Sequence, residues 1–459
     1  MKKHLIIIGG VAAGAKTAAK ARRQDENLKI TIYTSDKHVS YSGCGLPYYI
    51  SNTVKSNDEL IIRTPQEFKE KQNIDIHTEQ LVTRIDPDKK EISIKNLKTN
   101  EEYNDKYDYL MISTGAEPFV PPIEGRELKN VFTLRNVTDS IEIKKLIDSG
   151  SIKNAVIVGG GLIGLECAEA FKERGLNVTV IELAGQILPL LDTEMAEQVE
   201  KHCKEKGINI ITGDGVKKIT GNSKGIVDKV ITGNHEIKTD LVLLSIGVRP
   251  NTKIAKEAGI ELGVAGAIKV NKRMETNIPG IYSAGDCVES TNILTGEAVF
   301  TPLGSVANKQ ARVAAINMLG GHDEFYGVLG TVIVKVFDFN IAKVGLSEKE
   351  ASDKGLDCLA TTIKAKDKAG YYPGAKIITL KMIADKNTRR ILGCQVIGEG
   401  IVDKRIDVMV TAITGGLTVD DLEQLDLAYS PPYSPAIDIV IVAAGKLVKD
   451  LSREPATKI

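Results

Sequence analysis

Two similar glycine-rich stretches decide the fold. Residues 5–14 read LIIIGGVAAG, and residues 155–164 read AVIVGGGLIG. Each places its glycines directly after a short apolar run, which is typical of a buried parallel strand that turns into a helix. The apolar runs at residues 107–115 and 240–247 repeat at a similar separation. The sequence therefore predicts two related βαβ units in one chain.

Further elements complete this prediction. Residues 4–8 and 29–34 are predicted strands around a helix that ends near residue 23, and a second βαβ unit runs from 154 to 182. A return strand is expected at 280–286. Beyond about residue 325 the pattern changes, with strands at 331–337, 376–383 and 391–397 and a helix near 403–415.

The predicted fold class is α/β, with two Rossmann-like dinucleotide-binding domains plus a C-terminal α+β domain. The expected boundaries are residues 1–115 with 279–323 for the first, discontinuous domain, 116–278 for the second, and 324–459 for the third. The prolines at 118, 121 and 122 mark the crossover between the first two domains.

Composition narrows the classes of function. The 459 residues include 60 Lys+Arg and 60 Asp+Glu, so no net charge favours nucleic acid or an anionic membrane. No apolar run reaches the roughly 18–20 residues of a membrane span, and the N-terminus lacks the pattern of a signal peptide. Six cysteines are scattered without a Cys-x-x-Cys pair. A disulfide framework or metal site is therefore not expected, and a reducing cytoplasmic location is.

The second glycine turn satisfies the pattern G-x-G-x-x-G with Gly159, Gly161 and Gly164. Glu182 follows 18 residues after Gly164, at the end of the next strand. An acid there accepts from a ribose 2′-hydroxyl and repels a 2′-phosphate, so NADH is favoured over NADPH. The alternative is an ordinary glycine-rich turn between a strand and a helix.

The first glycine turn departs from that pattern. Gly9 and Gly14 hold the outer positions, but Val11 replaces the middle glycine, and Thr34 stands where an acid is usual. Thr34 can still bind a ribose hydroxyl. Asp286 ends the predicted return strand and suits a ribityl hydroxyl of a flavin, the alternative being a turn or cap residue.

Cys44 lies in the run SGCGLPYY at residues 42–49. Its flanking glycines leave the sulfur approachable, and Pro47 stiffens the backbone. The next cysteine is Cys167, so no local dithiol forms, and Cys44 is expected to work as a thiolate, sulfenic acid or mixed disulfide. The alternative is a small buried apolar residue. Cys167, in a helix, and Cys394, in a strand, fit that alternative.

These motifs together resemble the single-cysteine branch of the flavoprotein disulfide reductases, and within it the coenzyme A disulfide reductases. The matching segments span the whole chain: the two glycine turns, Tyr41–Tyr48, Ser113-Thr114-Gly115, Gly285-Asp286, Tyr371–Gly374 and Ala428–Ser434. The related NADH oxidases and peroxidases usually carry a histidine in the first turn, which this chain lacks. Many relatives have asparagine in place of Gly43 and glutamate in place of Thr34.

The resemblance implies FAD at the first turn, NADH (or NADPH) at the second, and a homodimer built on the C-terminal domain. It implies that Tyr371 and Tyr429 face the redox cysteine of the partner subunit, where a phenol can protonate or hydrogen-bond a leaving thiolate. Their alternative role is as aromatic residues of a dimer interface. The cofactor-binding residues expected are Gly9, Gly14, Thr34, Ser113, Thr114, Gly115, Asp286, Gly159, Gly161, Gly164, Glu182 and Gly247.

Three basic residues follow the first turn at helical spacing. Lys16, Lys20 and Arg23 share one helix face, and the matching face in the coenzyme A reductases contacts the adenosine phosphates. Ser40 and Lys71 are further candidates for this surface. The alternative for all of them is a solvated helix face.

The predicted activity is that of a FAD-dependent pyridine nucleotide-disulfide oxidoreductase, most similar to coenzyme A disulfide reductase. NADH reduces FAD, which then reduces a mixed disulfide on Cys44. Three alternatives stay open: an NADH oxidase or peroxidase that uses a sulfenic acid at Cys44, an NADH-dependent persulfide or polysulfide reductase, and a non-enzymatic FAD-binding protein that senses NADH.

Overall fold

The computed structural model describes residues 2–453, which form two compact units. The first comprises the described parts of Met1–Val120, Thr133–Asp148 and Gly247–Val328. The second comprises those of Pro121–Phe132, Ser149–Ile246 and Leu329–Ile459. None of the helices in the described residues is long and apolar enough to cross a membrane.

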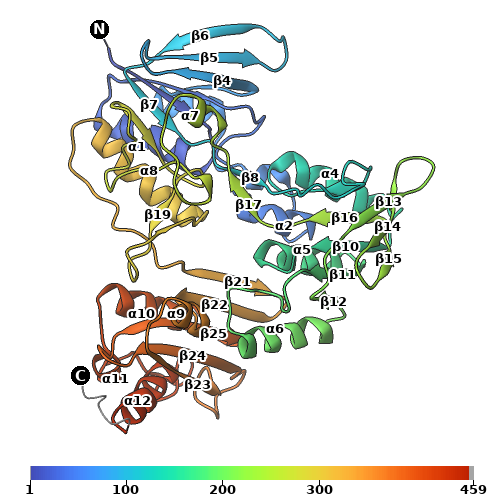
Figure 1. The fold of residues 1–459 in the computed structure, drawn as a ribbon, viewed down its shortest axis with the longest axis vertical. Helices are drawn as coiled ribbons and strands as arrows, with labels where there is room; N and C mark the ends of the chain where they lie inside the picture. The colour runs from blue at the N-terminus through green and yellow to red at the C-terminus, as the bar shows by residue number, and fades with distance from the viewer. Residues whose placement is uncertain (1, 454–459) are drawn as a thin grey trace. The chain divides into compact units, whose positions relative to one another are not determined.

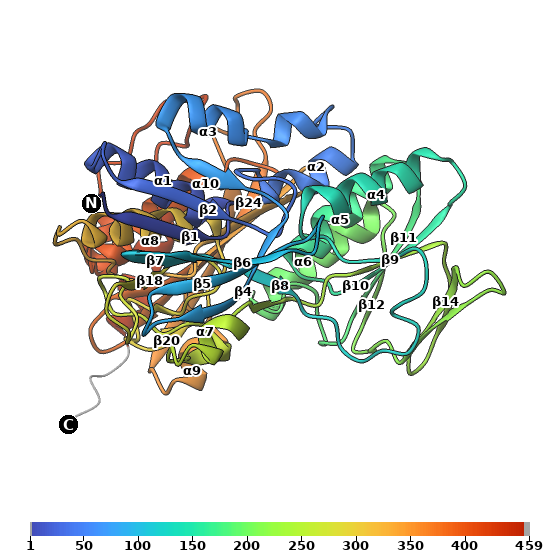
Figure 2. The same ribbon diagram turned by 90° about the horizontal axis from the view of Figure 1, so that it is seen from above.

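A five-stranded parallel sheet forms the centre of the first unit. Its strand order is β18-β7-β1-β2-β3, with bounds Ile281–Ser283, Tyr109–Ile112, His4–Ile8, Lys29–Tyr33 and Asp75–His77. Figure 2 labels the first four of these strands side by side. An antiparallel sheet, β4-β5-β6, adds Gln80–Asp86, Glu91–Asn96 and Glu102–Lys106 (Figure 1). Strand β1 is fully buried and β7 is buried from Leu110 to Ile112, as the continuous apolar runs predict.

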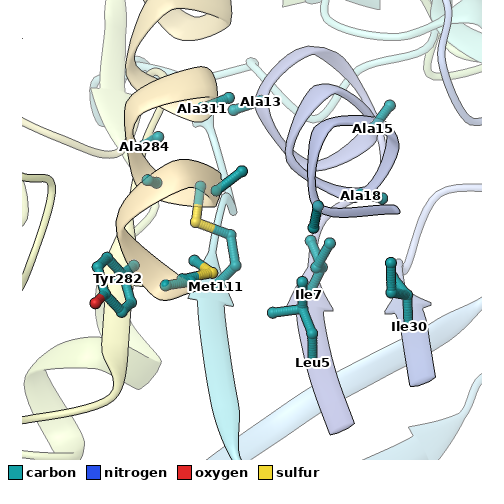
Figure 3. Close-up of a cluster of buried hydrophobic side chains, with 14 of the residues drawn as sticks. Leu5, Ile7, Ala13, Ala15, Ala18, Ile30, Met111, Tyr282, Ala284 and Ala311 are labelled. Atoms are coloured by element: carbon teal, nitrogen blue, oxygen red, sulfur yellow. The ribbon is translucent and has the colours of Figure 1, made fainter. Parts of the chain in front are cut away.

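Two alanine-rich helices pack on the first sheet and on each other. They are α1 (Ala12–Gln24) and α8 (Gly304–Met318), and Figure 3 shows small side chains such as Ala13 and Ala311 where they meet. Leu5 and Ile7 of β1 lie in the same cluster. Each large apolar side chain buried there contributes about 1.5–3 kcal/mol. This packing holds α1 directly behind the first glycine turn.

The unit boundaries differ from the predicted domain boundaries. The predicted second domain includes residues 247–278, whereas Gly247–Val328 belongs to the first compact unit of the structure. The physical reason is apolar packing, because Ala255, Ile260 and Ile268 are buried in one cluster with Ile6 and Ile8 of β1. The division into three domains itself stays a prediction.

The second unit repeats the first design. Its parallel sheet has the order β12-β11-β10-β16-β9, with bounds Asn209–Thr212, Asn177–Glu182, Asn154–Val158, Leu241–Leu244 and Val131–Phe132. Helix α5 (Leu162–Glu173) follows the second glycine turn, and α6 (Thr193–Glu205) precedes β12. A smaller antiparallel sheet comprises β13 (Lys218–Gly221), β14 (Val227–Ile231) and β15 (Glu236–Lys238). The predicted βαβ unit at 154–182 is confirmed.

The last part of the chain forms an antiparallel sheet with helices, which confirms the predicted α+β character. The strand order is β21-β22-β25-β24-β23, with bounds Val332–Val336, Phe339–Gly345, Ile391–Gly398, Ile377–Asp385 and Cys358–Lys366. Four helices accompany it: α9 (Glu348–Asp353), α10 (Asp403–Thr414), α11 (Val419–Glu423) and α12 (Ile439–Leu451). Helices α10 and α12 pack against the sheet.

Several connecting elements also belong to the first unit. The helices among them are η1 (Gly43–Gly45), α2 (Leu46–Ile50), η2 (Asn57–Leu60), α3 (Pro65–Gln72), α4 (Val137–Asp148), α7 (Lys253–Glu257) and η3 (Val264–Gly266). The strands form two antiparallel pairs, β8 (Ala116–Pro118) with β17 (Val248–Pro250) and β19 (Ser290–Thr291) with β20 (Ala298–Val299).

The predicted strand at 107–115 is shorter in the structure. It ends at Ile112 because Ser113 Oγ donates to the carbonyls of Ile8 and Gly9 and draws the chain into a turn.

Candidate functional site

The first glycine turn is closed by backbone approaches that only glycine permits. Gly9 has a φ of +99°, and a Cβ there would lie 2.2 Å from the Ser113 carbonyl oxygen. A Cβ at Gly14 would lie 1.8 Å from the Gly9 carbonyl oxygen. Helix α1 therefore starts directly against the end of β1, with its first N–H groups at the turn, where a phosphate can bind.

Val11 explains why the first turn lacks its middle glycine. The residue is half-buried and packs against an apolar cluster that includes Tyr41, Leu46 and Tyr49. This cluster supports the segment that carries Cys44. The valine therefore joins the nucleotide turn to the cysteine segment, which a glycine could not do.

Thr34 ends the second strand of this turn in a buried position. Its hydroxyl accepts a hydrogen bond from the Asp36 N–H at 3.3 Å, and Asp36 in turn accepts from the Tyr41 hydroxyl at 3.1 Å. Burial, reinforced by the Asp36 charge, raises the pKa of Tyr41. Contact between Thr34 and a ribose stays a prediction.

Asp286 lies three residues after the end of β18, on the same sheet edge as the turn. Burial raises the pKa of its carboxyl group, and the nearby Arg135 guanidinium opposes this shift. Within residues 2–453 no group donates a hydrogen bond to this carboxylate. The oxygens of a half-buried carboxylate without a protein donor can accept hydrogen bonds from a ligand. The residues present therefore fit a flavin dinucleotide with hydroxyl groups near Asp286.

Arg135 is a residue that sequence reasoning missed. Its Nε donates to the Ala116 carbonyl at 2.5 Å, and its Nη2 would lie 2.9 Å from a Cβ at Gly115. The guanidinium thus covers the Ser113–Gly115 turn and affects both Asp286 and Tyr41. Only its place before α4 brings it here, so no local motif could identify it.

Thr114 and Gly115 have structural partners as well. The Thr114 hydroxyl donates to the Asn251 carbonyl at 2.6 Å, and Gly115 has a φ of +69°. Gly285, before Asp286, donates its N–H to the fully buried Gln310 at 2.9 Å. These contacts bring the predicted residues of the first unit to one edge of its sheet.

The second glycine turn has the same construction. Gly159 has a φ of +110°, and a Cβ there would lie 2.1 Å from the Ser245 carbonyl oxygen. A Cβ at Gly164 would lie 2.1 Å from the Gly159 carbonyl oxygen, whereas one at Gly161 would meet nothing within 4 Å. The middle glycine therefore leaves open space, as close approach of a pyrophosphate requires. Gly247 also combines a φ of +105° with open space.

Glu182 lies at the end of β11, against the second turn. Its Oε2 accepts from the Gly160 N–H at 2.7 Å, and its Oε1 accepts from the Ala184 N–H at 2.8 Å. The carboxylate is thus held beside the turn by the backbone itself. Each oxygen has a further lone pair with which it could accept from a ribose hydroxyl.

Cys44 lies in the short helix η1 and is exposed. The segment before it is fixed to the first turn, because Ser40 N–H donates to the Gly10 carbonyl at 2.8 Å and Ser42 N–H donates to the Leu60 carbonyl at 2.8 Å. A Cβ at Gly45 would lie 2.6 Å from Leu60 Cδ2, while one at Gly43 would meet nothing within 4 Å. The chain is therefore closely packed at Gly45 and open at Gly43, on either side of the exposed cysteine.

The remaining cysteines differ from Cys44. Cys167, Cys203, Cys287 and Cys394 are buried, as predicted for Cys167 and Cys394, and Cys358 is half-buried. Burial raises the pKa of all five thiols, to about 12 for Cys203. A buried thiol is a poor thiolate and a poor nucleophile. Among the six, all within the described residues, only Cys44 is exposed.

The basic residues of α1 have unequal positions. Lys16 and Lys20 are half-buried and Arg23 is exposed, and none of them forms an ion pair with another residue of the described chain. Lys71, by contrast, lies 2.7 Å from the Glu67 carboxylate on the exposed face of α3. Ser40 is half-buried with a φ of +47°. Their contact with substrate stays a prediction.

The structure brings Tyr371 and Tyr429 together. They are 58 residues apart in the chain, yet a side-chain hydrogen bond with Tyr429 raises the pKa of Tyr371. Tyr371 is 78% exposed and Tyr429 is 52% exposed. Large exposed aromatic side chains of this kind are typical of a binding or subunit interface.

The chain matches one protein family over most of its length. Residues 3–313 match the family described as pyridine nucleotide-disulphide oxidoreductase, and residues 331–440 match the dimerisation domain of that family.

No group of three or more His, Cys, Asp or Glu side chains in the described residues could hold a metal ion.

Three known proteins are similar over nearly the whole chain. An NADH oxidase of Methanocaldococcus jannaschii is 40% identical, covering 98% of this chain and 99% of its own. An NAD(P)H coenzyme A polysulfide/persulfide reductase of Pyrococcus horikoshii is 37% identical, covering 97% and 99%. A coenzyme A disulfide reductase of Staphylococcus haemolyticus is 34% identical, covering 95% and 98%.

Solved structures agree with this likeness. The reduced CoADR-RHD of Bacillus anthracis is 39% identical with a TM-score of 0.95, covering 98% of this chain and 81% of its own. An NAD-dependent persulfide reductase from A. fulgidus is 42% identical with a TM-score of 0.95, covering 98% and 84%. A FAD-dependent pyridine nucleotide-disulphide oxidoreductase from Desulfovibrio vulgaris is 31% identical with a TM-score of 0.77, covering 98% and 100%.

Proposed function

Because the chain belongs to the pyridine nucleotide-disulphide oxidoreductase family, we propose that it reduces a low-molecular-weight disulfide at Cys44, with coenzyme A disulfide as the substrate. The single observation that carries this proposal is the exposed thiol of Cys44, fixed by backbone hydrogen bonds to the first glycine turn. No other cysteine of the six combines exposure with such a position.

Two nucleotide cofactors accompany this thiol in the proposal. Gly9, Gly14, Asp286 and the Ser113–Gly115 turn hold FAD, and the second turn with Glu182 holds NADH in preference to NADPH. When bound, the pair supplies the two electrons of each reduction. The chain's part is to orient these groups and to exclude side reactions.

The thiol chemistry at Cys44 is thiol–disulfide exchange. The Cys44 thiolate attacks one sulfur of the substrate R–S–S–R, a Cys44–S–S–R bond forms, the substrate S–S bond breaks, and R–S⁻ leaves and takes a proton. Two electrons and a second proton then convert Cys44–S–S–R into the Cys44 thiolate and R–SH. The exposure of Cys44 allows a substrate disulfide to reach its sulfur.

Tyr371 and Tyr429 supply the proton or hydrogen bond for the leaving thiolate. We place them opposite Cys44 of the partner subunit in a homodimer, which the match to the family's dimerisation domain supports. A phenol has an ordinary pKa of about 10, so it is protonated at neutral pH and can donate a proton or hydrogen bond to a thiolate.

Coenzyme A is proposed as the substrate group because of three basic side chains on α1, those of Lys16, Lys20 and Arg23. Three cations on one helix face, none of them engaged in an ion pair within residues 2–453, can bind the phosphates of coenzyme A. The even charge balance of the whole chain means that this recognition is local. A reducing cytoplasm suits an enzyme that keeps its thiols free, and we propose that location.

Reduction of a persulfide or polysulfide is a second candidate. The relatives from Pyrococcus horikoshii and A. fulgidus favour it, since they act on persulfides and are 37% and 42% identical to this chain. The exchange step at Cys44 is the same for both classes of acceptor. Only the affinity for the coenzyme A group separates them.

The test is anaerobic NADH consumption with coenzyme A disulfide, beside hydrogen peroxide, polysulfide and air. The proposal expects the highest kcat/KM with coenzyme A disulfide. Replacing Lys16, Lys20 and Arg23 by Met raises KM for that substrate about tenfold or more, while flavin reduction by NADH is unchanged.

A matched triple variant controls for net charge. Lys253, Lys256 and Lys269 lie on the exposed surface of the same unit, and their replacement by Met should leave KM unchanged. Equal KM values in the two triple variants, or a higher kcat/KM with polysulfide than with coenzyme A disulfide, would contradict the proposed substrate.

A further inference from the structure

The first turn of α10 carries a fully buried arginine. Arg405 is 1% exposed and is among the largest side chains buried in the protein. Its Nη2 donates to Asp438 Oδ2 at 2.9 Å and to the Asp367 carbonyl at 2.6 Å, and its Nη1 donates to the Ile401 carbonyl at 2.9 Å. A guanidinium can serve several acceptors at once because its donors form a rigid planar fork.

One of these acceptors lies at the base of the loop that carries Tyr371. Asp367 N–H donates to the Lys376 carbonyl at 2.8 Å, and Lys376 N–H donates back to Asp367 Oδ1 at 2.8 Å. Asp367 Oδ2 accepts from the Ile401 N–H at 3.1 Å. The two ends of the loop thus meet at Asp367, which Arg405 holds through its carbonyl.

The other acceptor lies at the base of the loop that carries Tyr429. Asp438, 4% exposed, caps the start of α12, and its Oδ2 accepts from the Ser434 hydroxyl at 2.8 Å. Ser434 N–H donates to the Ser430 carbonyl at 3.1 Å. Arg405 therefore reaches this loop through Asp438 and Ser434.

Two direct contacts join the same parts. Ala369 N–H donates to the Pro431 carbonyl at 3.3 Å, which links one tyrosine loop to the other. Lys404 Nζ donates to the Ala428 carbonyl at 3.3 Å, directly before Tyr429. The start of α10 (Figure 1) is therefore attached to both loops.

We propose that Arg405 is a positioning residue that holds the loops of Tyr371 and Tyr429 together, so that the two phenols stay paired. The inference rests on the proposed role of these tyrosines in disulfide reduction. Apolar residues of similar volume fill a core at least as well as a buried ion pair, so packing alone does not require this pair. Its hydrogen bonds to both loop bases are what the apolar residues would lack.

The test compares two changes at this network with a matched control. Arg405→Lys keeps the charge but loses the planar fork, and Ser434→Ala removes only the link to the Tyr429 loop. The control is Arg389→Lys, because Arg389 forms a bidentate pair with Asp420 that involves neither tyrosine loop.

Two measurements separate positioning from general stability. The first is a spectrophotometric titration of tyrosinate in the holoenzyme, with Tyr371→Phe identifying the phenol whose pKa is raised. The second times flavin reduction by NADH and disulfide turnover separately. Arg405→Lys and Ser434→Ala should return that pKa toward its ordinary value and lower disulfide kcat roughly 10- to 100-fold. Flavin reduction stays unchanged, and Arg389→Lys changes neither measurement.

The inference is overturned if both network variants keep the wild-type tyrosine titration. It is also overturned if they slow flavin reduction as much as disulfide turnover. Should Arg405→Lys fail to fold, Ser434→Ala decides alone. The titration needs no substrate, so a wild-type enzyme that is inert with coenzyme A disulfide refutes the proposed function without affecting this result.

Discussion

The two glycine turns of this chain are built alike and end differently. Gly9 N–H donates to the Tyr33 carbonyl at 2.8 Å, and Gly159 N–H donates to the Ile181 carbonyl at 2.8 Å. Further on, the Gly10 and Gly160 carbonyls accept from Ser40 and Leu188, both of which have a φ of +47°. The same backbone device is therefore used twice.

The two copies differ four residues after Ser40 and Leu188. After Ser40 stands Cys44, exposed in a short helix, whereas after Leu188 stands Asp192, which is 7% exposed. Asp192 accepts from Gln395 Nε2 at 2.6 Å and lies 3.1 Å from Lys381 Nζ. One copy of the device presents a reactive group, and the other anchors an element to the C-terminal sheet. A repeated backbone can thus serve chemistry in one place and stability in another.

The largest effect is expected at Cys44. Cys44→Ser removes the nucleophile, so disulfide turnover should fall at least about 10³-fold while NADH still reduces the flavin. Because the side chain is exposed, the urea midpoint should not move. Cys358→Ser, at a half-buried thiol, is the matched control and should keep full turnover. Turnover in Cys44→Ser near the wild-type rate would break the assignment of chemistry to the first copy.

A loss of stability, rather than of turnover, is expected when Lys381, the ion-pair partner of Asp192, is replaced. Lys381→Met leaves a buried carboxylate without its cation, which costs about 3–5 kcal/mol of unfolding free energy. Urea unfolding of the holoenzyme measures this loss. Lys349→Met, which breaks an exposed pair with Asp353, should change the midpoint little. A Lys381→Met variant as stable as Lys349→Met would remove the contrast between the two copies.

The same pair predicts a pH signature. Burial opposes ionisation of Asp192, but the Glu348 N–H and the Lys381 ammonium hold its pKa below the ordinary value. Its contribution to stability is therefore present above the unfolded pKa of about 3.9 and is lost as the pH falls through the folded pKa. In Lys381→Met the folded pKa moves toward or above the unfolded value, so the loss of stability on acidification should be smaller than in the wild type. Urea midpoints measured across the acid range would reveal it.

Glycine substitutions test the shared geometry. Gly14→Ala and Gly164→Ala each force a Cβ against a carbonyl oxygen, and overpacking of this kind costs about 1–3 kcal/mol. Gly14→Ala should lower the flavin content of the purified protein, and Gly164→Ala should slow flavin reduction by NADH at normal flavin content. Gly150→Ser, at an open position with a φ of +66°, controls for backbone strain alone. Loss of flavin in Gly164→Ala would reverse the assigned roles.

The smallest effect is expected at Glu182, which has Thr34 as its counterpart. Glu182→Thr removes the charge that repels a 2′-phosphate, so the ratio of kcat/KM for NADH over NADPH should fall about tenfold. Glu236→Thr, at an exposed acid of the same unit, should leave the ratio unchanged. An unchanged ratio in Glu182→Thr would show that another residue selects the nucleotide.

Local patterns in the sequence were sufficient for much of the fold. Continuous apolar runs identified β1, β10 and their neighbours, since strands buried on both faces leave no polar positions. The small residues of α8 and the strands of the antiparallel sheet β4-β5-β6 were not identified. Their apolar residues are interrupted by polar ones, and their pairing depends on partners distant in the chain.

The residues of the candidate site also fall into those that the sequence identifies and those that only the structure identifies. Glycine spacing, the flanks of Cys44 and the two tyrosine motifs are continuous segments, so the sequence identifies them. Arg135 and Arg405 are single residues within segments of ordinary composition. They matter only through acceptors such as the carbonyls of Ala116 and Asp367, which lie far from them in the chain.

Short continuous motifs identify the two nucleotide turns and the family without a structure, because a sharp strand-to-helix turn requires glycine at particular steps of one short segment. Only the packing of distant segments fixes how Tyr371 meets Tyr429 and which acceptors Arg135 and Arg405 reach. It also decides that the counterpart of Cys44 in the second copy is a buried carboxylate. Such pairing depends on how distant segments pack, and no short segment contains that information.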